Sequence, residues 1–351
     1  MSKELSQLTY REMYKQPESF EAINATLDQI YKELDQVFDE SYDELIFTGC
    51  GTSFYLAQTA AHAFSACNQI PAKAVCCSEL YYFPEVFLKN RKVLVLPITR
   101  KSYTTEVRMA IDKVRAYPGV KTLAITCDAA SADYNDYMLL SPETAEESVI
   151  MTRSFTSMVY LSVIMAMYTA GKTSEITAMA GYGQNARDAL AKMDHLAKQI
   201  ITNHQNLNLF ITLGQGEYYG VASECMNKMK EMGITNSEAY YSLEYRHGPM
   251  SLVDENTLII LLSHDQTTSE DRKIIAQMNG YGAITAAIGN QVTKNIPEAA
   301  YTLDLAYGYH TLQNTALIGF IGQFIGYYIA RAKNIDADHP RHLSQAIIIE
   351  K

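Results

Sequence analysis

One stretch in the second half of the chain combines carboxylate and lysine side chains at a spacing that suits proton transfer. Glu224, Lys228 and Glu231 follow one another at intervals of four and three residues, which places all three on one face of a helix. Solvent-exposed ion pairs are the usual meaning of such spacing. Here Cys225 and Met229 belong to an otherwise apolar helix, so we expect some of the charges to be partly buried. A desolvated carboxylate has a raised pKa and becomes a usable base near neutral pH.

A histidine that could act beside this base lies a short distance further along. His247 is followed directly by Gly248 and Pro249, a pair that indicates a loop and not a helix face. The imidazole could hydrogen-bond within the turn as a structural element. Its ordinary pKa of about 6.5 equally suits a proton shuttle. The residue types therefore predict that Glu231 and His247 move protons.

The first half of the chain contains a glycine- and hydroxyl-rich turn that suits an anion. The segment GCGTS at residues 49–53 follows an apolar run and opens a helical pattern. Glycines allow a tight turn and close approach to a ligand, and the amides at a helix N-terminus attract negative charge. A dinucleotide fingerprint would need glycine where Phe54 stands. The turn therefore favours a phosphate on a smaller ligand over NAD, although many such turns are glycine-rich for packing alone.

Two further turns carry hydroxyl groups at the ends of predicted strands. The segment TRKSYTTE at residues 99–106 offers Thr99, Ser102 and Thr104 as phosphate donors or as ordinary helix caps. The segment ESVIMTRSFT at residues 147–156 again precedes a long helical pattern, and its hydroxyls could cap that helix or line the crevice. Ligand sites of parallel sheets lie at the carboxyl ends of the strands. We therefore expect the first two turns to face one crevice.

The elements that must position these residues alternate between strands and helices. Helical spacing predicts one or two helices in residues 1–40. Apolar β-type runs then occupy residues 44–48, 93–99, 121–127 and 137–140, each followed by a helical pattern. Continuous apolar strands that alternate with helices indicate an α/β fold with a parallel sheet covered on both faces.

The second half repeats this plan. LIFTGCGTSFYLA at residues 45–57 matches LFITLGQGEYYGVA at residues 209–222, and VLVLPIT at residues 93–99 matches TLIILLS at residues 257–263 with nearly the same offset. This agreement across two elements favours internal duplication. We expect N-terminal helices in residues 1–40, a first lobe in 41–200, a second lobe in 201–334 and a tail in 335–351 that covers the active site.

Composition limits the classes of function. The chain has 351 residues, which suits two domains, and 29 basic against 39 acidic residues give a net charge of −10. Without a long basic run or an apolar stretch of about 18 residues, neither nucleic acid nor a membrane is expected as a partner. The polar start predicts a cytoplasmic protein. The six cysteines lack metal-binding spacing, and reduced thiols are expected.

Taken in order, these motifs resemble the SIS family of sugar-isomerase domains. The series runs from CGTS and the Ser/Thr turn through ESV and TRSFT, GQG, ExxxKxxE and EYRHGP to DADHPRHLSQ near the C-terminus. The resemblance covers residues from about 40 to the end and is strongest to the isomerase half of glucosamine-6-phosphate synthase and its stand-alone relatives. It implies two tandem SIS domains, each a parallel flavodoxin-like sheet flanked by helices, with a hexose 6-phosphate held by the first.

The resemblance also assigns roles to individual residues. It implies phosphate contacts from Ser53, Thr99, Arg100, Lys101, Ser102 and Thr104. Positions that line the sugar are Cys50, Gly51, Thr52, Val149 and Met151, joined by Ser344 and Gln345 of the tail. Glu231 corresponds to the base that carries a proton between C1 and C2, with Glu224 and Lys228 as its charged partners. His247 corresponds to a ring-opening histidine from the neighbouring subunit, which implies a homodimer.

Two departures bear on the reaction. Lys101 and Ser102 replace the second serine and the glycine of the family's phosphate turn, and Gln345 replaces the lysine that forms a Schiff base with a ketose. The chain is also too short for an N-terminal glutaminase domain, and no cysteine follows Met1. Glutamine-dependent synthesis is therefore not expected. Isomerisation through a cis-enediol needs an acid/base, a proton donor for the ring oxygen and a phosphate anchor, without a metal or redox cofactor.

Three functions remain open from the sequence. The first is an isomerase or deaminase that acts on hexose 6-phosphates by proton transfer between C1 and C2. The second is a deglycase that splits 6-phosphofructosamines, which needs the same Glu231 and His247 pair. The third is a non-catalytic phosphosugar-binding protein, which the two domain copies and the intact pair disfavour.

Overall fold

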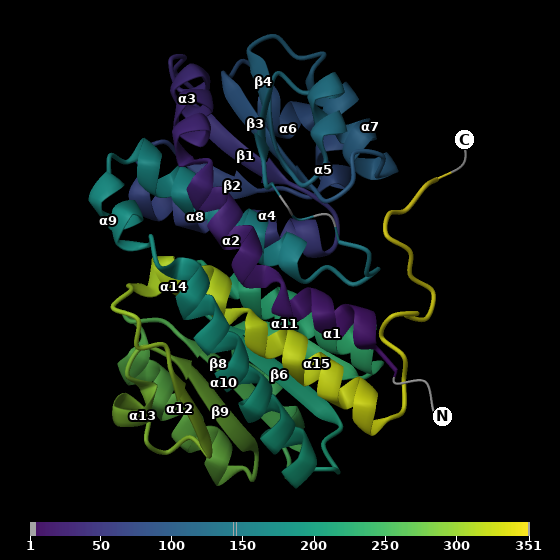
Figure 1. The fold of residues 1–351 in the computed structure, drawn as a ribbon, viewed down its shortest axis with the longest axis vertical. Coiled ribbons are helices and arrows are strands. Elements are labelled where there is room, and N and C mark those ends of the chain that lie inside the picture. The colour runs from purple at the N-terminus through teal and green to yellow at the C-terminus, as the bar shows by residue number, and fades with distance from the viewer. Residues whose placement is uncertain (1–4, 143, 145, 350–351) are drawn as a thin grey trace. The chain divides into compact units, whose positions relative to one another are not determined.

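A run of seven buried residues, Val93–Thr99, forms β3, the middle strand of the first of two sheets. The structure is a computed structural model that describes residues 5–142, 144 and 146–349. Its described residues fall into two compact units (Figure 1). The N-terminal unit comprises residues 15–147, 151–183 and 344–351, and the C-terminal unit comprises residues 1–14, 148–150 and 184–343.

The sheet of the N-terminal unit is entirely parallel, with the strand order β2-β1-β3-β4-β5. The strands beside β3 are β1 (Glu44–Thr48), β2 (Ala72–Ala74), β4 (Val120–Thr126) and β5 (Tyr137–Leu140). This is the flavodoxin-like order, in which the strand sequence reverses direction between β1 and β3. The carboxyl ends of those two strands therefore flank the point at which this fold holds its ligands.

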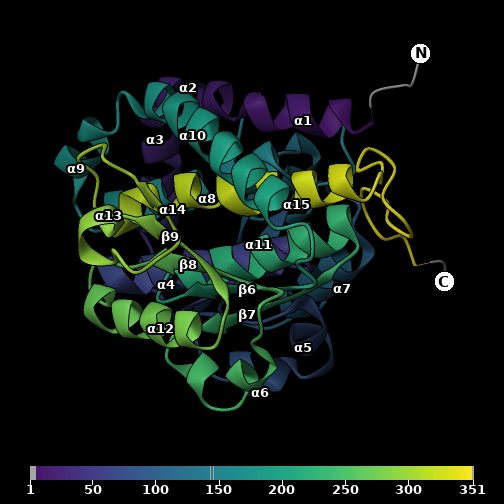
Figure 2. The same ribbon diagram turned by 90° about the horizontal axis from the view of Figure 1, so that it is seen from below.

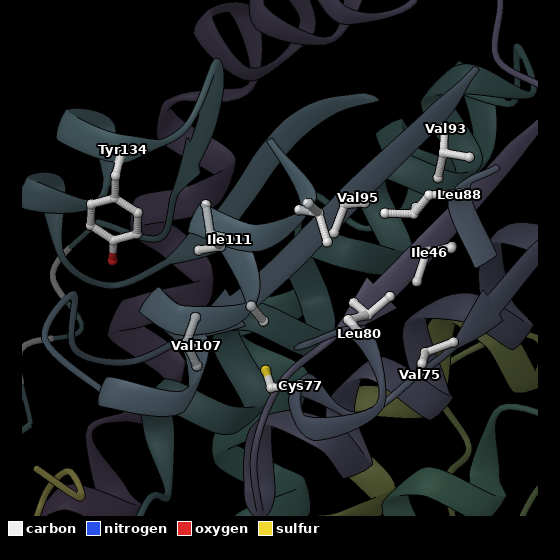
Figure 3. Packing of buried hydrophobic residues seen from close by; sticks show 12 residues of the cluster. Ile46, Val75, Cys77, Leu80, Leu88, Val93, Val95, Val107, Ile111 and Tyr134 are labelled. Carbon is white, nitrogen blue, oxygen red and sulfur yellow. The ribbon is translucent and has the colours of Figure 1, made fainter. Parts of the chain in front are cut away.

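Helices cover both faces of this sheet. They are α2 (Gln16–Ala25), α3 (Leu27–Val37), α4 (Thr52–Cys67), α5 (Cys77–Tyr82), α6 (Pro84–Leu88), α7 (Thr105–Val114), α8 (Arg153–Thr169) and α9 (Thr173–Ala178), with the 3-10 turn η1 (Ala129–Tyr134). On one face, Ile46 and Val95 of the strands pack against Leu80 of α5 and other buried residues (Figure 3). Phe47 points to the opposite face and meets Phe64 of α4, with ring centroids 6.3 Å apart.

The C-terminal unit repeats the architecture, with the strand order β10-β9-β8-β6-β7 and all neighbours parallel. Its strands are β6 (Leu209–Gly214), β7 (Asn236–Tyr241), β8 (Thr257–Ser263), β9 (Ile284–Gly289) and β10 (Tyr301–Asp304). Its helical elements are α1 (Gln7–Tyr14), most of α10 (Tyr182–Asn203), α11 (Tyr218–Gly233), η2 (Glu244–Arg246), η3 (Pro249–Leu252), α12 (Thr268–Gly280), α13 (Val292–Asn295), α14 (Thr311–Ile318) and α15 (Phe320–Ala332). Figure 2 shows α12 on one side of the sheet and α11 and α15 on the other.

The two sheets have the same order when their strands are numbered from the start of each unit, which confirms the predicted repeat of the plan. The backbone repeats as well. Gly51 and Gly216 both have positive φ angles, of 53° and 59°, at the turn before α4 and α11. A Cβ on Gly49 would lie 2.6 Å from the backbone of Ser53, and one on Gly214 would lie 2.4 Å from the backbone of Tyr218. Both turns therefore need glycine for the close approach of strand and helix.

The strands predicted in the first half are confirmed, although β4 begins and ends one residue earlier than expected. The prediction of one or two helices before the first sheet is wrong, because the chain forms three. Pro17 lies in the first turn of α2, where backbone amides have no partner within the helix, so the amide hydrogen that proline lacks is not missed. Thr26 separates α2 from α3, and its hydroxyl donates back to the carbonyl oxygens of Ala22 and Ile23. No helix in the described chain combines the length and the apolarity needed to cross a membrane.

Candidate active site

The turn at residues 49–53 joins β1 to α4 and presents the start of a 16-residue helix. The left-handed conformation of Gly51 reverses the chain there, so that α4 begins at Thr52. Thr52 and Ser53 are largely buried, with 6% and 7% exposed. Cys50 is partly buried beside them. The helix dipole and two hydroxyl groups at one point make this turn suitable for a phosphate group.

The second hydroxyl-rich turn, between β3 and α7, is fixed mainly by its own hydrogen bonds. The hydroxyls of Thr99 and Thr104 both donate to the carbonyl oxygen of Lys101, at 2.7 and 3.3 Å. Thr104 occupies the N-cap position of α7, but its hydroxyl does not cap the helix. Ser102 donates its amide to Asp128 Oδ2 at 2.9 Å, and its carbonyl oxygen accepts from Tyr134 at 2.7 Å. The turn is thus preorganised, with the Lys101 side chain partly exposed on it.

Arg100 lies in the same turn but faces inward. Its Nη1 is 3.6 Å from Glu146 Oε2, and both side chains are buried. Its Nη2 donates to the carbonyl oxygen of Gln345 at 3.0 Å. The structure therefore gives Arg100 a carboxylate partner within the N-terminal unit, whereas the resemblance had implied a phosphate contact.

Glu146 is a buried residue that the sequence reasoning missed. It accepts hydrogen bonds from the amide and hydroxyl of Thr152 at 2.6 and 2.5 Å, from the amide of Arg153 at 2.9 Å and from the hydroxyl of Ser154. This carboxylate caps the N-terminus of α8, where negative charge is favourable. The hydroxyls of Thr152 and Ser154 in the third turn thus serve the cap. An acidic residue just before a Ser/Thr-rich helix start was the available signal.

The other residues predicted to line the sugar are spread over both units. Met151 belongs to the N-terminal unit and Val149 to the C-terminal unit, and both are partly buried. In the tail, the Gln345 side chain donates to the carbonyl oxygen of Glu147 at 2.8 Å, and Ser344 donates to Ala346 at 2.9 Å.

The end of the tail lies against the start of α7. The amide of Thr105 donates to the carbonyl oxygen of Ile347 at 3.2 Å, and the Thr105 hydroxyl accepts from the amide of Ile349 at 3.1 Å. The end of the tail thus docks beside the second hydroxyl-rich turn. Its predicted position over the active site stays a prediction.

The charged row on α11 is confirmed and partly buried, as expected. Lys228 Nζ lies 2.9 Å from Glu224 Oε1 and 2.5 Å from Glu231 Oε2. The side chains of Lys228 and Glu224 are only 1% and 4% exposed, while that of Glu231 is 22% exposed. Burial alone would lower the pKa of Lys228, but the two carboxylates outweigh it and the pKa is raised. Lys228 therefore stays charged and holds Glu231, the most exposed of the three, in one position.

His247 lies in an exposed loop directly after η2. Its backbone amide donates to the carbonyl oxygen of Glu244 at 3.0 Å, and Gly248 follows with a φ of 124°. Within the described C-terminal unit, no hydrogen bond or ion pair joins the imidazole to Glu231. The structure thus groups Glu224, Lys228 and Glu231 and leaves His247 apart from them.

No group of three or more His, Cys, Asp and Glu side chains among the described residues is arranged to hold a metal ion.

Comparison with known proteins identifies the family. The model of the SIS domain matches residues 41–170 and again residues 205–330. The chain belongs to the SIS domain family. The two matches correspond to the two sheets described above, each of which has the flavodoxin-like order expected for this family.

Curated relatives are longer than this SIS chain. It is 26% identical to the glutamine–fructose-6-phosphate aminotransferase [isomerizing] of Helicobacter pylori, over 97% of this chain and 58% of that protein. It is equally 26% identical to the protein of the same name from Sulfurisphaera tokodaii, over 95% and 55%. The chain thus spans a little over half the length of these relatives.

Solved structures match nearly the whole chain. A glucosamine-6-phosphate deaminase from Thermotoga maritima is 25% identical, with a TM-score of 0.80 and coverage of 98% of this chain and 100% of that one. A tagatose-6-phosphate ketose/aldose isomerase from Escherichia coli is 20% identical, with a TM-score of 0.84 and coverage of 98% and 96%. The second likeness is one of fold alone.

Proposed function

We propose that the chain is a phosphosugar isomerase of the SIS family, which acts on hexose 6-phosphates or their 2-amino forms by proton transfer between C1 and C2. The observation that carries the proposal is the fixed Glu231 carboxylate, held 2.5 Å from the fully buried Lys228 on α11. The deaminase and aminotransferase names of the relatives support an aldose–ketose or amino-sugar substrate.

The proposed mechanism divides its tasks between two groups of residues. The turns of the N-terminal unit hold the phosphate through the start of α4 and the hydroxyl of Ser53. Glu231 removes the proton from the carbon next to the carbonyl, which gives a cis-enediol, and returns it to the neighbouring carbon. The substrate therefore gains and loses no atoms in the isomerisation, and a 2-amino substrate releases ammonia once the ketimine is hydrolysed by water.

The tail supports a reaction without a lysine imine. Gln345 carries an amide where the aminotransferring relatives need a primary amine, and its Nε2 is engaged with the carbonyl oxygen of Glu147. An amide nitrogen cannot condense with a ketose to form a Schiff base. We therefore propose that the proton transfer takes place without a lysine imine.

The ring-opening step is assigned to His247 of a second copy of the chain. The exposed imidazole in the loop after η2 is available to a neighbouring subunit. An imidazole can donate a proton to the ring oxygen and recover it afterwards. This proposal requires a homodimer in which each site combines Glu231 of one chain with His247 of the other.

The first test separates chemistry from binding. Glu231→Gln keeps the shape and removes the base, so turnover should fall by roughly a factor of 100 to 10,000 while the substrate Kd stays within about threefold. Candidate substrates are fructose 6-phosphate, glucosamine 6-phosphate and 6-phosphofructosamines. Calorimetry gives the Kd, and product analysis for ammonia, amino acid or isomerised sugar identifies the reaction. Glu255→Gln, at an exposed position before β8, is the matched control. Unchanged turnover in Glu231→Gln would refute the assignment.

Mixed dimers test the shared site. Glu231→Gln and His247→Ala should each be inactive alone. After co-refolding in equal amounts, about a quarter of all sites should combine both intact residues, so that about a quarter of the wild-type rate returns. Mixtures that stay inactive, while each variant still dimerises, would show that both residues act within one chain.

A further inference from the structure

A groove in the described C-terminal unit has no acidic residue in its lining. It consists of two cavities of about 460 and 520 Å³, which share Leu207 and Lys333. Both include residues that lead into β6, and the second also includes Thr235, which precedes β7. The first reaches the ends of α10 and α15, which lie side by side (Figure 1). Cavities of this size suit a small-molecule ligand.

The cations of this groove have no carboxylate partners. Lys198 and Arg331 line the first cavity. Lys230 lines the second cavity, and Lys333 lines both. No ion pair within the described part of the chain includes any of these four side chains. In a chain with a net charge of −10, four such cations along one groove favour an anionic ligand.

Lys333 connects the two cavities and keeps a donor for a ligand. Its Nζ donates to the carbonyl oxygens of Gly233 and Ile234, at 3.0 and 3.1 Å. An ammonium group has three N–H donors, so one is left after these two hydrogen bonds. Burial lowers the pKa of Lys333, because no carboxylate offsets the loss of water. A bound anion would supply that missing charge.

Helix ends account for only part of the positive charge. Lys230 and Arg331 lie in the last turns of α11 and α15, and Lys198 lies near the end of α10. Cations at these places offset the helix dipoles. Each helix end carries about half a negative charge, so three ends leave a surplus of about 2.5 positive charges. This surplus suits a ligand with two or more phosphate groups.

The first cavity also has an apolar part. Phe210, Ile329 and Ile201 belong to its lining and are 2%, 3% and 8% exposed. Thr202 and Gln205 add exposed hydrogen-bonding groups. A ring can therefore pack on the apolar side chains while its polar edge meets the rim, which a bare phosphate ion would leave unused.

We propose that this groove binds a small molecule in which two or more phosphate groups are joined to a ring. The ring packs on Phe210 and Ile329, and the phosphates extend along the four cations toward the second cavity. None of the residues assigned to the phosphosugar lines either cavity. Glu231 is absent from both linings although Lys230 is present, because neighbouring residues of a helix point about 100° apart. The proposal therefore does not depend on the proposed isomerase activity.

Three probes separate the contribution of charge from that of the ring. Pyrophosphate carries the charge alone, adenosine carries the ring alone, and ADP carries both. In calorimetry on the full chain at about 50 mM salt without divalent cations, ADP should bind with a Kd below about 1 mM. Pyrophosphate should bind about tenfold more weakly, and adenosine should not bind measurably. Raising the salt to about 300 mM should weaken ADP binding about fivefold or more, because the charges are screened.

The same titrations can overturn the proposal. Absence of ADP binding at low salt would refute the site. Adenosine that binds as tightly as ADP would refute the role of the cations, and pyrophosphate that binds as tightly as ADP would refute the role of the ring. ADP binding that weakens as the protein concentration rises would show that a second copy of the chain covers the groove instead.

Variants at exposed positions locate the bound ADP. Lys198→Gln and Arg331→Gln should each weaken ADP binding by about three- to tenfold. Ala332→Trp, which fills the first cavity without a change in charge, should abolish it. Lys294→Gln removes an exposed cation of the same unit that lines neither cavity, and this matched control should bind ADP like the wild type. Binding that is lost in Ser53→Ala but kept in the groove variants would place ADP at the turn at residues 49–53 and overturn the proposal.

Discussion

Replacing Lys228 with methionine removes a buried cation from between two carboxylates and should strongly destabilise the C-terminal unit. At an effective dielectric constant of about 20, contacts of 2.9 and 2.5 Å each correspond to roughly 6 kcal/mol of gross attraction. Desolvation of each ion costs several kcal/mol in the opposite direction. The intact trio therefore contributes little net stability. Without the lysine, however, Glu224 keeps its desolvation cost and loses its counter-charge.

The expected loss follows from that asymmetry. Removal of one partner from a buried pair costs about 3–5 kcal/mol, and Glu224, at 4% exposed, has little access to water. Lys228→Met should lower the free energy of unfolding by this amount in urea titrations at neutral pH. The double variant Lys228→Met/Glu224→Gln should recover about half of the loss, because it removes the stranded charge. Lys230→Met, at an exposed position of the same helix, should stay within about 0.5 kcal/mol of the wild type.

The pH dependence gives a second check on the cause. In Lys228→Met, a buried Glu224 without a cation should have a folded-state pKa above its unfolded value of about 4.3. Such a group destabilises the fold above its folded pKa and ceases to do so below the unfolded pKa. The difference between variant and wild type should therefore shrink as the pH falls through the raised folded-state pKa toward about 4.3. A loss under about 1 kcal/mol at neutral pH, or a double variant less stable than the single one, would refute this reasoning.

Two further substitutions test buried carboxylates elsewhere. Glu146→Gln should lower the free energy of unfolding by about 3–5 kcal/mol, because it removes the carboxylate beside the buried Arg100 and weakens the cap of α8. Glu147→Gln, at the exposed next position, should change it by almost nothing. Equal effects of the two substitutions in urea titrations would contradict this. Burial raises the pKa of Asp271 from 3.8 to about 6, so its charge should cost about 3 kcal/mol above pH 6, and stability should fall as the pH rises from about 4 to 6. Asp271→Asn should remove that slope in pH-dependent unfolding and the exposed Asp112→Asn should not; a slope that persists in Asp271→Asn would contradict the assignment.

Local patterns sufficed for the four strands predicted in the first half and for the charged row on α11. The buried strand Val93–Thr99 is apolar along its whole length, and the intervals from Glu224 to Glu231 specify a helix face whatever the tertiary fold. Glycines at 49 and 214 marked both strand–helix turns, because each turn excludes a Cβ. These features depend on neighbours within a few residues, which a single sequence displays.

Non-local pairings were beyond such patterns. No residue close to Arg100 in the sequence indicates that Arg100 pairs with Glu146, because only the folded chain brings the two side chains together. The contact of Ile347 with the amide of Thr105 likewise joins the tail to a turn more than two hundred residues away. The sequence shows that these turns are rich in hydroxyl groups, but only the structure shows that Thr99 and Thr104 donate to their own turn.

The duplicated turns show how one backbone serves two kinds of chemistry. Gly51 and Gly216 adopt nearly the same φ, and the next residue is Thr52 in one unit and Glu217 in the other. Glu217 is 3% exposed, and its Oε2 lies 3.6 Å from Nε2 of His264. His264 directly follows β8, as Arg100 directly follows β3 in the N-terminal unit. A buried carboxylate at the position of Glu217 repels a phosphate, whereas a hydroxyl can donate a hydrogen bond to it. The exchange after the glycine therefore disfavours phosphate at the second turn, and the helix that follows this turn carries Glu231.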